Sequence, residues 1–451
     1  FEDISAKLAE VFNVDTDKQR IDSVHIKSNM RRLGRIGIFS KSIHKFLVNL
    51  KRGHKEQFET VDQALIDKYF SEKALGCFSM VKPSESTKTL ASVAGDLYNL
   101  VEQFKDFKPV CAMHSYKLLE RVLKEQCNLK VSDDQKQVEV KKPKEIASDS
   151  LQNPSDPDAT YSGHKGQGYQ VQVMETYTDT EDQEVKSKTL NLVTEVEVEK
   201  ASDSDAQALI PAIESTQKRG LGPKELEADT LYGSDENHQA AQSMGVELVA
   251  PAKGKEKEGA VSLSEFEFSD QGHVLACPQG HEPLTSKKKK TRFTQGFDCE
   301  TCAKCPLING CPVRPGKRYY YLYYDERAMR IAKRRAAEQT TEFKDRYRWR
   351  AGVEATMSEL DRRTGIKRLR VRGFKAVRFS ATLKAIGINL FRAAAVRKAT
   401  NHLSAASSKT KSALNHAIFF VKEHFESIFS ALKNYFALYL KNIDHRLITN
   451  V

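Results

Sequence analysis

Strand-like and helical segments alternate between residues 168 and 251, and this alternation restricts the fold more than any other feature. Residues 168–174 and 189–198 alternate apolar and polar side chains with a period of two, as half-buried strands do. An acidic turn around 179–182 separates them, which predicts an antiparallel pair. The segments that follow are a helix at 203–218, a strand at 226–229, a helix at 235–244 and a strand at 245–251. This order predicts an α/β fold.

A further strand and a long helical block precede these segments. Residues 17–28 are strand-like, with Ile21, Val24 and Ile26 as the apolar positions. From about residue 31 to residue 130 the apolar spacing becomes helical. Residues 131–160 are polar and end in Asn-Pro-Ser-Asp-Pro-Asp, which is typical of a loop. The helical block therefore separates the first strand from the rest of the α/β segments.

Five of the eight cysteines lie between residues 277 and 311, and this clustering favours a metal site. A Cys-Pro-x-Gly knuckle followed by closely spaced cysteines can fold around tetrahedral zinc. The preferred ligands are Cys277, Cys302, Cys305 and Cys311, with Cys299 or His281 as substitutes. A disulfide cluster is the alternative, but it requires an oxidising compartment for which the sequence gives no signal.

The run Tyr347-Arg348-Trp349-Arg350-Ala351-Gly352-Val353-Glu354 places a carboxylate beside basic and aromatic residues. In a helix, Tyr347, Arg350 and Glu354 share one face. Eight basic residues and no acidic one follow between Arg362 and Arg378. A carboxylate beside a cationic surface suits metal-assisted chemistry on a phosphate backbone. The simpler interpretation is a surface ion pair between Arg350 and Glu354.

Composition agrees with a polyanionic partner. The chain has 451 residues, enough for two or three domains, and a net charge of +12. No uncharged apolar run approaches the roughly 20 residues that span a bilayer, and no signal peptide pattern begins at Phe1. We therefore expect a soluble, cytoplasmic protein. Because the chain does not begin with Met, we also expect an N-terminal segment to be missing.

Several motifs resemble those of bacterial insertion-sequence transposases of the Asp-Asp-Glu class. They are Ile21-Asp22-Ser23-Val24-His25, Asp156-Pro157-Asp158-Ala159, Gly168-Tyr169-Gln170-Val171-Gln172, Ala228-Asp229-Thr230-Leu231-Tyr232-Gly233-Ser234 and Tyr347-x2-Arg350-x3-Glu354. The resemblance covers most of residues 15–395. It implies a ribonuclease-H-like mixed sheet flanked by helices, with a helical insertion and a small Cys-rich zinc-knuckle insertion.

The resemblance also assigns a catalytic set. Asp229 matches the second Asp of the family and Glu354 matches the Glu. Asp22 is the favoured first Asp, although Val24 replaces the usual Thr of that motif. Asp156 is the alternative first Asp, because it directly precedes the predicted strand pair, but its Pro-rich setting is poor strand sequence. The family usually has Lys or Arg seven residues after the Glu, where this chain has Asp361.

The implied activity is metal-dependent cleavage at insertion-sequence ends, followed by transfer of the freed 3′-hydroxyl into target DNA. Asp22, Asp229 and Glu354 would bind two Mg²⁺ or Mn²⁺ ions. The implied partner is double-stranded DNA, both as transposon ends and as target. A second copy of the chain is also implied, as a homodimer on DNA. The residues expected to bind DNA are Tyr347, Arg350, Arg362, Arg363, Lys367, Arg368, Arg370 and Arg372. An inactive DNA-binding derivative is the alternative. A zinc-dependent nuclease is disfavoured because four thiolates leave no open metal position.

The sequence thus predicts seven segments. They are the start of the catalytic core (1–30), the helical insertion (31–135), the core with the second Asp (136–255), the Cys-rich insertion (256–325), the core helices with the Glu (326–395), a linker (396–412) and a C-terminal amphipathic helix (413–451).

Overall fold

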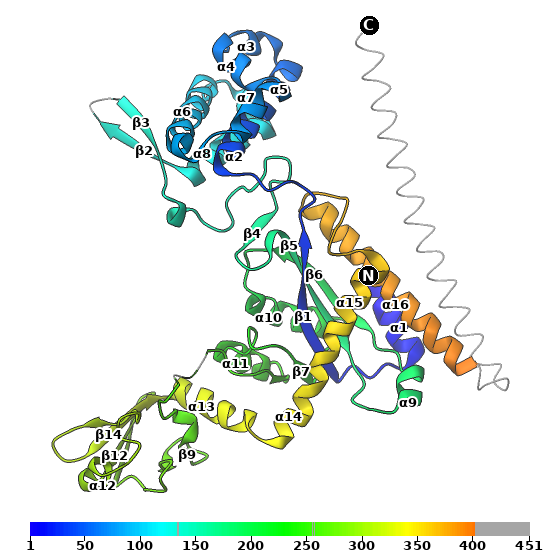
Figure 1. The fold of residues 1–451 in the computed structure, drawn as a ribbon. Helices are drawn as coiled ribbons and strands as arrows, with labels where there is room; N and C mark the ends of the chain where they lie inside the picture. The colour runs from blue at the N-terminus through cyan, green and yellow to red at the C-terminus, as the bar shows by residue number, and fades with distance from the viewer. Residues whose placement is uncertain (133–134, 255, 257, 402–451) are drawn as a thin grey trace.

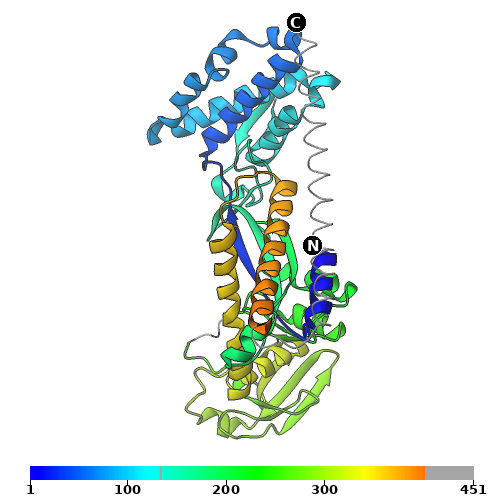
Figure 2. The same cartoon turned by 90° about the vertical axis from the view of Figure 1, so that its right-hand side faces the viewer.

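A computed structural model describes residues 1–132, 135–254, 256 and 258–401, and in it three parts follow one another along a long axis (Figures 1 and 2). A block of helices lies at one end, a mixed sheet with flanking helices lies in the middle, and a Cys-rich unit lies at the other end. The predicted α/β class is confirmed. The predicted helix at 413–451 lies outside the described residues, as does most of the linker.

The central sheet has six strands. Its order is β6-β5-β1-β7-β8, and the short strand β4 also pairs with β5. Their bounds are β1 (Lys18–Lys27), β4 (Thr160–Ser162), β5 (Gly166–Thr176), β6 (Val193–Lys200), β7 (Glu225–Glu227) and β8 (Glu247–Val249). β5 runs antiparallel to β1 and β6, whereas β7 runs parallel to β1 and β8. The antiparallel pair is confirmed, but its connection contains a short helix, α9 (Gln183–Lys188), whose first turn Asp182 caps.

Helices cover both faces of this sheet. Val24 and Ile26 of β1 pack in one hydrophobic cluster with residues of α15 (Gly352–Thr364) and α16 (Phe374–Asn401). Ile21 points to the opposite face and packs with residues of α10 (Leu209–Lys218) and α11 (Asp235–Ser243). A further helix, α1 (Glu2–Phe12), packs on α16. Helices on the two faces therefore bury Ile21, Val24 and Ile26 of β1.

The helical block follows β1 and has its own core. Phe39, Ile43, Phe46 and Leu47 of α2 are fully buried there, at the spacing that marks one helix face. Its elements are α2 (Arg35–Gly53), α3 (Lys55–Glu59), α4 (Gln63–Tyr69), α5 (Glu72–Leu75), η1 (Gly76–Ser79), η2 (Pro83–Glu85), α6 (Ser86–Phe104), α7 (Lys108–Cys111), α8 (His114–Gln126) and the hairpin β2 (Cys127–Ser132) and β3 (Gln135–Val140). The chain returns to the sheet through η3 (Pro143–Glu145) and β4.

The Cys-rich unit is built on a second, four-stranded sheet of order β11-β12-β14-β13. Phe293, Phe297, Leu322 and Tyr324 form its buried core. Its elements are η5 (Leu263–Glu265), β9 (Glu267–Phe268), β10 (Val274–Ala276), β11 (Thr285–Lys289), β12 (Arg292–Phe297), α12 (Cys299–Ala303), β13 (Arg314–Pro315) and β14 (Tyr320–Asp325).

The chain then returns to the central sheet as a series of helices. They are α13 (Glu326–Glu338), α14 (Thr341–Tyr347), the 3₁₀ turn η6 (Arg348–Ala351), α15 and α16. The single helix face expected for Tyr347, Arg350 and Glu354 is therefore interrupted, because η6 separates α14 from α15. α16 continues to Asn401, past residue 396 where the linker was expected to begin.

One described helix, Phe374–Thr400 within α16, is long and apolar enough to cross a membrane by length and composition alone. Its residues Val377, Ala381, Ala385 and Ile388 are buried in the cluster that covers the central sheet. A helix that packs on a protein core passes the same test, so the length and composition of α16 are weak grounds for a membrane span.

Candidate active site

The register of two parallel strands brings Asp22 and Asp229 together. Arg20 of β1 pairs with Glu227 of β7, and each aspartate lies two residues further along its own chain segment. Because side chains alternate along a strand, Asp22 lies on the same face as Val24 and Ile26, the face that α15 covers. Asp229 follows the end of β7, and its carboxylate accepts a hydrogen bond from the Leu231 amide at 2.7 Å. Two distant chain segments thus meet at one edge of the site.

Arg350 joins the three predicted carboxylates. One of its guanidinium nitrogens, Nη2, lies 2.8 Å from Asp22 Oδ2 and 4.0 Å from Asp229 Oδ2. The other, Nη1, lies 3.5 Å from Glu354 Oε1. The surface ion pair considered from the sequence therefore exists, but its arginine also reaches both aspartates. Asp22, Asp229 and Glu354 converge on a single cation.

The two ends of this cluster differ in their exposure to solvent. Burial raises the pKa of Asp22 above its ordinary value and nearby Asp229 adds to this, while a backbone hydrogen bond from Ser23 and the charge of Arg350 act in the opposite direction. The Asp22 side chain is 18% exposed and that of Glu354 is 72% exposed. Asp22 is thus largely enclosed, whereas Glu354 is open to solvent.

The oxygen donors suit hard divalent cations, since Mg²⁺ and Mn²⁺ prefer carboxylates. Within the described ranges, however, no three His, Cys, Asp or Glu side chains are grouped so that they could hold a metal ion. Arg350 supplies the positive charge between the carboxylates. The residue types are those that Mg²⁺ and Mn²⁺ prefer, and in the described structure the three carboxylates surround the guanidinium of Arg350.

Asp156 lies in a different environment. Its carboxylate accepts hydrogen bonds from Ser28 Oγ at 2.6 Å, from the Tyr169 hydroxyl at 2.6 Å and from the Gly373 amide at 3.2 Å. It is 1% exposed. These partners tie the loop before β4 to the end of β1 and to the start of α16, so the described contacts of Asp156 are those of a buried structural group.

The predicted DNA-binding residues lie on two segments. Tyr347 ends α14, stacks on Phe343 with ring centroids 5.5 Å apart, and has a pKa raised by burial. The basic residues lie at the end of α15 and in the loop before α16, and all are exposed: Arg362, Arg363, Lys367, Arg368, Arg370 and Arg372. Lys27 at the end of β1 donates its amide to the Lys367 carbonyl at 2.9 Å. The basic loop is thus attached to the strand that carries Asp22.

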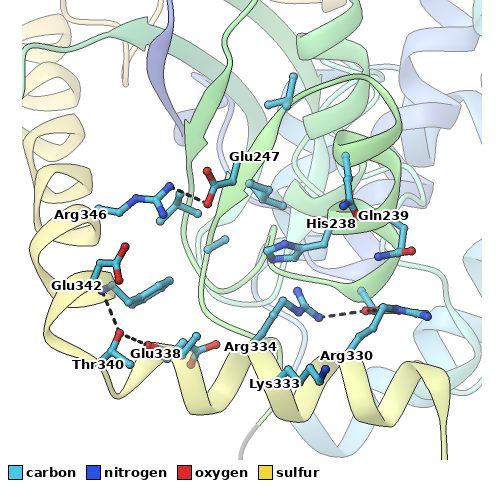
Figure 3. A pocket seen from close by; sticks show the side chains of 18 of the residues that line it. His238, Gln239, Glu247, Arg330, Lys333, Arg334, Glu338, Thr340, Glu342 and Arg346 are labelled. Atoms are coloured by element: carbon cyan, nitrogen blue, oxygen red, sulfur yellow. Dashed lines mark hydrogen bonds and ion pairs between the residues drawn. The ribbon is translucent and has the colours of Figure 1, made fainter. Parts of the chain in front are cut away.

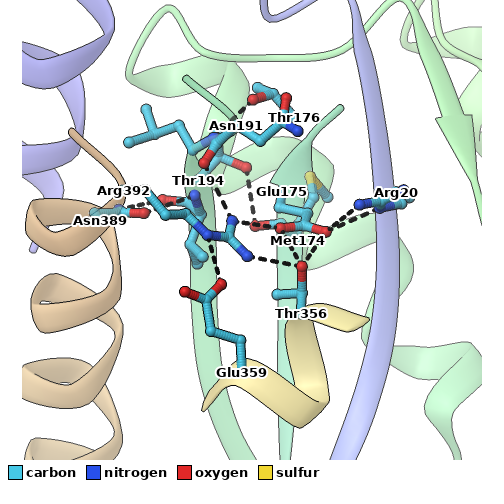
Figure 4. A network of polar contacts seen from close by, with 12 residues as sticks. Arg20, Met174, Glu175, Thr176, Asn191, Thr194, Thr356, Glu359, Asn389 and Arg392 are labelled. Carbon is cyan, nitrogen blue, oxygen red and sulfur yellow. Dashed lines mark hydrogen bonds and ion pairs between the residues drawn. The ribbon is translucent and has the colours of Figure 1, made fainter. Parts of the chain in front are cut away.

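A buried polar network supports the turn that carries Arg350 (Figure 4). Glu175 of β5 is 0% exposed, and it accepts hydrogen bonds from Arg20 Nε at 2.8 Å and Arg392 Nη1 at 2.7 Å. Although burial opposes ionisation, Arg392 and Arg20 hold the pKa of Glu175 below its ordinary value. Arg20 Nη1 also donates to the Trp349 carbonyl at 2.7 Å. The network therefore connects the sheet directly to η6.

The sequence did not lead us to these network residues, although one signal was present. Glu175 continues the series Val171 and Val173 at a period of two, so its side chain must point to the same buried face. A charge at such a position requires a partner. Arg20 likewise lies on the same face of β1 as the buried Val24, because an even number of residues separates them, so its charge also requires a partner.

A cavity of about 650 Å³ lies between α11 and β8 on one side and α13 and α14 on the other (Figure 3). Its charged lining is balanced, with cations Arg330, Lys333, Arg334 and Arg346 and acids Asp235, Glu247, Glu338 and Glu342. Arg346 pairs with Glu225 and Glu247 at 2.7 and 2.8 Å. Arg330 pairs with Asp235 at 2.6 Å. These pairs fasten α13 and α14 to the sheet, and with them the chain segment that leads to Arg350.

The cysteines of the knuckle gather around a second, small cavity of about 20 Å³. Cys277, Cys302, Cys305, Cys311 and His281 line it, whereas Cys299 is not among its lining residues. All eight cysteines are free thiols, so the disulfide alternative is not realised. Burial, with the neighbouring Cys311, Cys277 and Cys305, raises the pKa of Cys302 to about 11. The thiols are therefore close enough to influence one another, although their arrangement does not amount to a metal-holding group within the described chain.

Comparison with known proteins agrees with the motifs. Residues 276–394 match the family model described as the transposase DDE domain. The matched segment contains Glu354, the Cys-rich sheet and the basic loop, and it lies downstream of Asp22 and Asp229. Neither the curated proteins nor the solved structures provided a match. The family match therefore shows that residues 276–394, about a quarter of the chain, are similar to the transposase DDE domain, in agreement with the motifs of the Asp-Asp-Glu class.

Proposed function

We propose that this protein cleaves DNA at insertion-sequence ends and joins the freed 3′-hydroxyl to target DNA, with Asp22, Asp229 and Glu354 as its catalytic carboxylates. The observation that carries the proposal is the convergence of these side chains on Arg350. Asp22 is preferred to Asp156 because only Asp22 shares this cation with Asp229. The strand order and directions of the central sheet support a ribonuclease-H-like core.

The three carboxylates would hold two Mg²⁺ or Mn²⁺ ions, which supply activation of the attacking oxygen and stabilisation of the leaving oxygen. Arg350 is the counter-ion of the site without metal. Because Arg350 pairs with Glu354 at i, i+4, its guanidinium would lie beside a DNA phosphate that approaches that carboxylate. We therefore assign Arg350 and Tyr347 to positioning of the DNA strand beside the carboxylates.

The exposed basic residues would bind the phosphate backbone. The cations are Arg362, Arg363, Lys367, Arg368, Arg370 and Arg372. Arg363 and Lys367 have carboxylate neighbours in Glu359 and Asp361. Arg362, Arg368 and Arg370 form no ion pair in the part of the chain that the structure describes, so their charges are available for DNA.

Cys277, Cys302, Cys305 and Cys311 would hold a structural zinc ion, because their thiols line one cavity. Transposition joins two DNA ends, so a homodimer on DNA is expected, acting in the bacterial cytoplasm at the nucleoid. The helical block at 31–135 and the Cys-rich unit at 256–325 would be insertions in the catalytic core.

A strand-transfer assay with Mg²⁺ and the element's terminal repeats tests the proposal. Wild type should form joined products, and Asp229→Ala and Glu354→Ala should form none while still binding DNA. Equal products from all three proteins would refute the catalytic assignment. DNA binding without products from the wild type would instead support the inactive DNA-binding derivative.

A further inference from the structure

We infer that the uncovered face of the β11-β12-β14-β13 sheet binds single-stranded DNA, stacking bases on Tyr321 and Tyr323. The choice of DNA over RNA rests on the proposed function.

The two faces of this sheet differ in what covers them. Phe293, Leu322 and Tyr324 point to the core, where β9, β10 and α13 pack against them. Side chains alternate, so Thr294, Tyr321 and Tyr323 point to the opposite face. Tyr323 is 58% exposed. This exposure leaves part of the Tyr323 side chain accessible to a ligand, although its ring also stacks on Tyr321.

Three tyrosines of this face form a row of rings, in which Tyr323 is exposed and Tyr319 and Tyr321 are half-buried. Tyr321 and Tyr323 are stacked with centroids 5.9 Å apart and an interplanar angle of 28°. Tyr319 meets Tyr321 edge to face at 6.0 Å and lies over Gly296, where a Cβ would approach the Tyr319 ring to 3.1 Å. Glycine at 296 thus makes room for the row. Base-to-ring stacking needs such flat exposed surfaces and does not depend on base identity.

Cations surround these rings on the same face. The strand register places Lys287 opposite Thr294, Lys289 opposite Arg292 and Arg314 opposite Tyr321. All four cations are exposed, and within the described chain none of them forms an ion pair. The face has one carboxylate, Asp325, and this caps the Ala328 amide of α13 at 2.7 Å. The excess positive charge is complementary to a phosphate backbone.

Rings and cations together favour a single strand over a duplex. In a duplex the bases are stacked on each other and their faces are closed to a protein ring, whereas a single strand offers both bases and phosphates. A transposon end that has been cut, or whose end base pairs have opened, presents such a strand. The Cys-rich unit would therefore hold an unpaired segment while the carboxylates act elsewhere on the same DNA.

Fluorescence anisotropy with the full chain and a labelled single strand tests this inference. Tyr323→Ala should weaken binding at least about five-fold, and Tyr321→Ala with Tyr323→Ala more, because each stacked base contributes roughly 1 kcal/mol or more. Tyr323→Trp should retain affinity. Leu275→Ala, which alters a similarly exposed apolar residue of the same unit, is the matched control and should bind as wild type does.

Two further measurements make the result specific. Lys287→Gln with Arg314→Gln should reduce the slope of log affinity against log salt by about 0.7 for each charge removed. Binding of the duplex of the same sequence should change little in the tyrosine variants. Binding of a single strand of RNA shows whether the surface distinguishes ribose from deoxyribose. Wild-type affinity of the double tyrosine variant for single strands, or an equal loss for duplex, would overturn the inference.

The outcome is separable from that of the proposed function. Asp229→Ala should lose strand transfer and bind single strands normally. If Asp229→Ala transfers strands as wild type does, the catalytic proposal fails while the sheet surface stands. If the tyrosine variants bind single strands as wild type does while Asp229→Ala loses strand transfer, the inference about the sheet surface is wrong and the catalytic proposal stands.

Discussion

Arg350 Nη2 lies 2.8 Å from Asp22 Oδ2, and both side chains are 18% exposed. This half-buried pair links the turn before α15 to the middle of β1. A divalent ion that binds Asp22 and Asp229 must compete with the guanidinium for the same oxygens. The metal affinity of the proposed site would therefore depend on the position of Arg350.

Replacing Arg350 tests that coupling. Arg350→Gln removes the competing charge, so we expect Mn²⁺ to bind several-fold more tightly than in wild type, measured by calorimetry without DNA. Strand transfer should fall, because the DNA loses a positioning cation. Arg52→Gln, which changes an exposed arginine of α2, should leave both properties unchanged. Weaker metal binding in Arg350→Gln would contradict competition at this site.

The two candidate first aspartates should respond differently to substitution. Asp156→Ala leaves Ser28, Tyr169 and the Gly373 amide without their acceptor, which should cost roughly 1 to 3 kcal/mol of stability. Asp22→Ala should abolish strand transfer, because it removes one of the proposed catalytic carboxylates. It should cost little thermal stability, because burial already disfavours the charged form of Asp22 and raises its pKa. Activity per folded molecule and the unfolding midpoint should be measured for both. A stable but inactive Asp156→Ala protein would reverse the assignment.

The buried network around Glu175 should be among the most sensitive sites in the core. Glu175→Ala leaves Arg20 and Arg392 without their shared carboxylate, and breaking a buried pair in this way costs roughly 3 to 5 kcal/mol. The loss should appear as a lower midpoint of thermal unfolding. Glu300→Ala, at an exposed carboxylate that is paired only loosely with Lys304, is the control. A midpoint for Glu175→Ala like that of the control would show that the network contributes little.

Glu227 should make stability depend on pH. Burial, opposed by the hydrogen bond from Tyr177, raises the pKa of Glu227 from 4.5 to about 7. The folded state therefore keeps the proton longer than the unfolded state, and its stabilisation is complete below about pH 4.5 and lost as pH rises through about 7. Glu227→Gln should flatten this dependence and raise the unfolding midpoint at pH 8. Thermal unfolding from pH 4.5 to pH 8 would show it, and parallel curves for the two proteins would contradict it.

Zinc at the cysteine cluster can be measured directly. Elemental analysis should find about one zinc per chain, as four thiolates bind one ion. Cys302→Ser should lose it, and removal of zinc by a chelator should lower the unfolding midpoint of the wild type. Cys77→Ser, at an exposed thiol of the helical block, should keep its metal. A chain without zinc but with unchanged stability would exclude a structural role for the ion.

Much of the fold was predictable because periodicity reports burial directly. The strand at 17–28, the antiparallel pair and the helix–strand–helix–strand series are found near their expected positions, as β1, β5, β6, α10, β7, α11 and β8. Boundaries were less accurate where capping decided them. Asp182 begins the unexpected helix α9, and η6 divides the helix expected to carry Tyr347 and Glu354.

The candidate site was predictable only as a set of residue types. Motif resemblance selected Asp22, Asp229 and Glu354, but their meeting depends on the pairing of Arg20 with Glu227 between strands that are distant in sequence. The apolar pattern of a strand indicates its buried face but not which distant strand pairs with it. The long-range bond from Arg20 to the Trp349 carbonyl was invisible for the same reason.

The antiparallel pairing of β1 with β5 means that the helical block leaves and re-enters the sheet at neighbouring points. Lys27 pairs with Gly168, and the Ser28 amide donates to the Gln167 carbonyl at 3.1 Å. The helical block thus lies within the connection between two antiparallel neighbours, β1 and β5. Its length and content can therefore change by insertion or deletion without altering the strand register beneath Asp22, since loop length affects the closure entropy only slowly. Replacement of the helical block should therefore leave the pairing of β1 with β5, and with it the position of Asp22, unchanged.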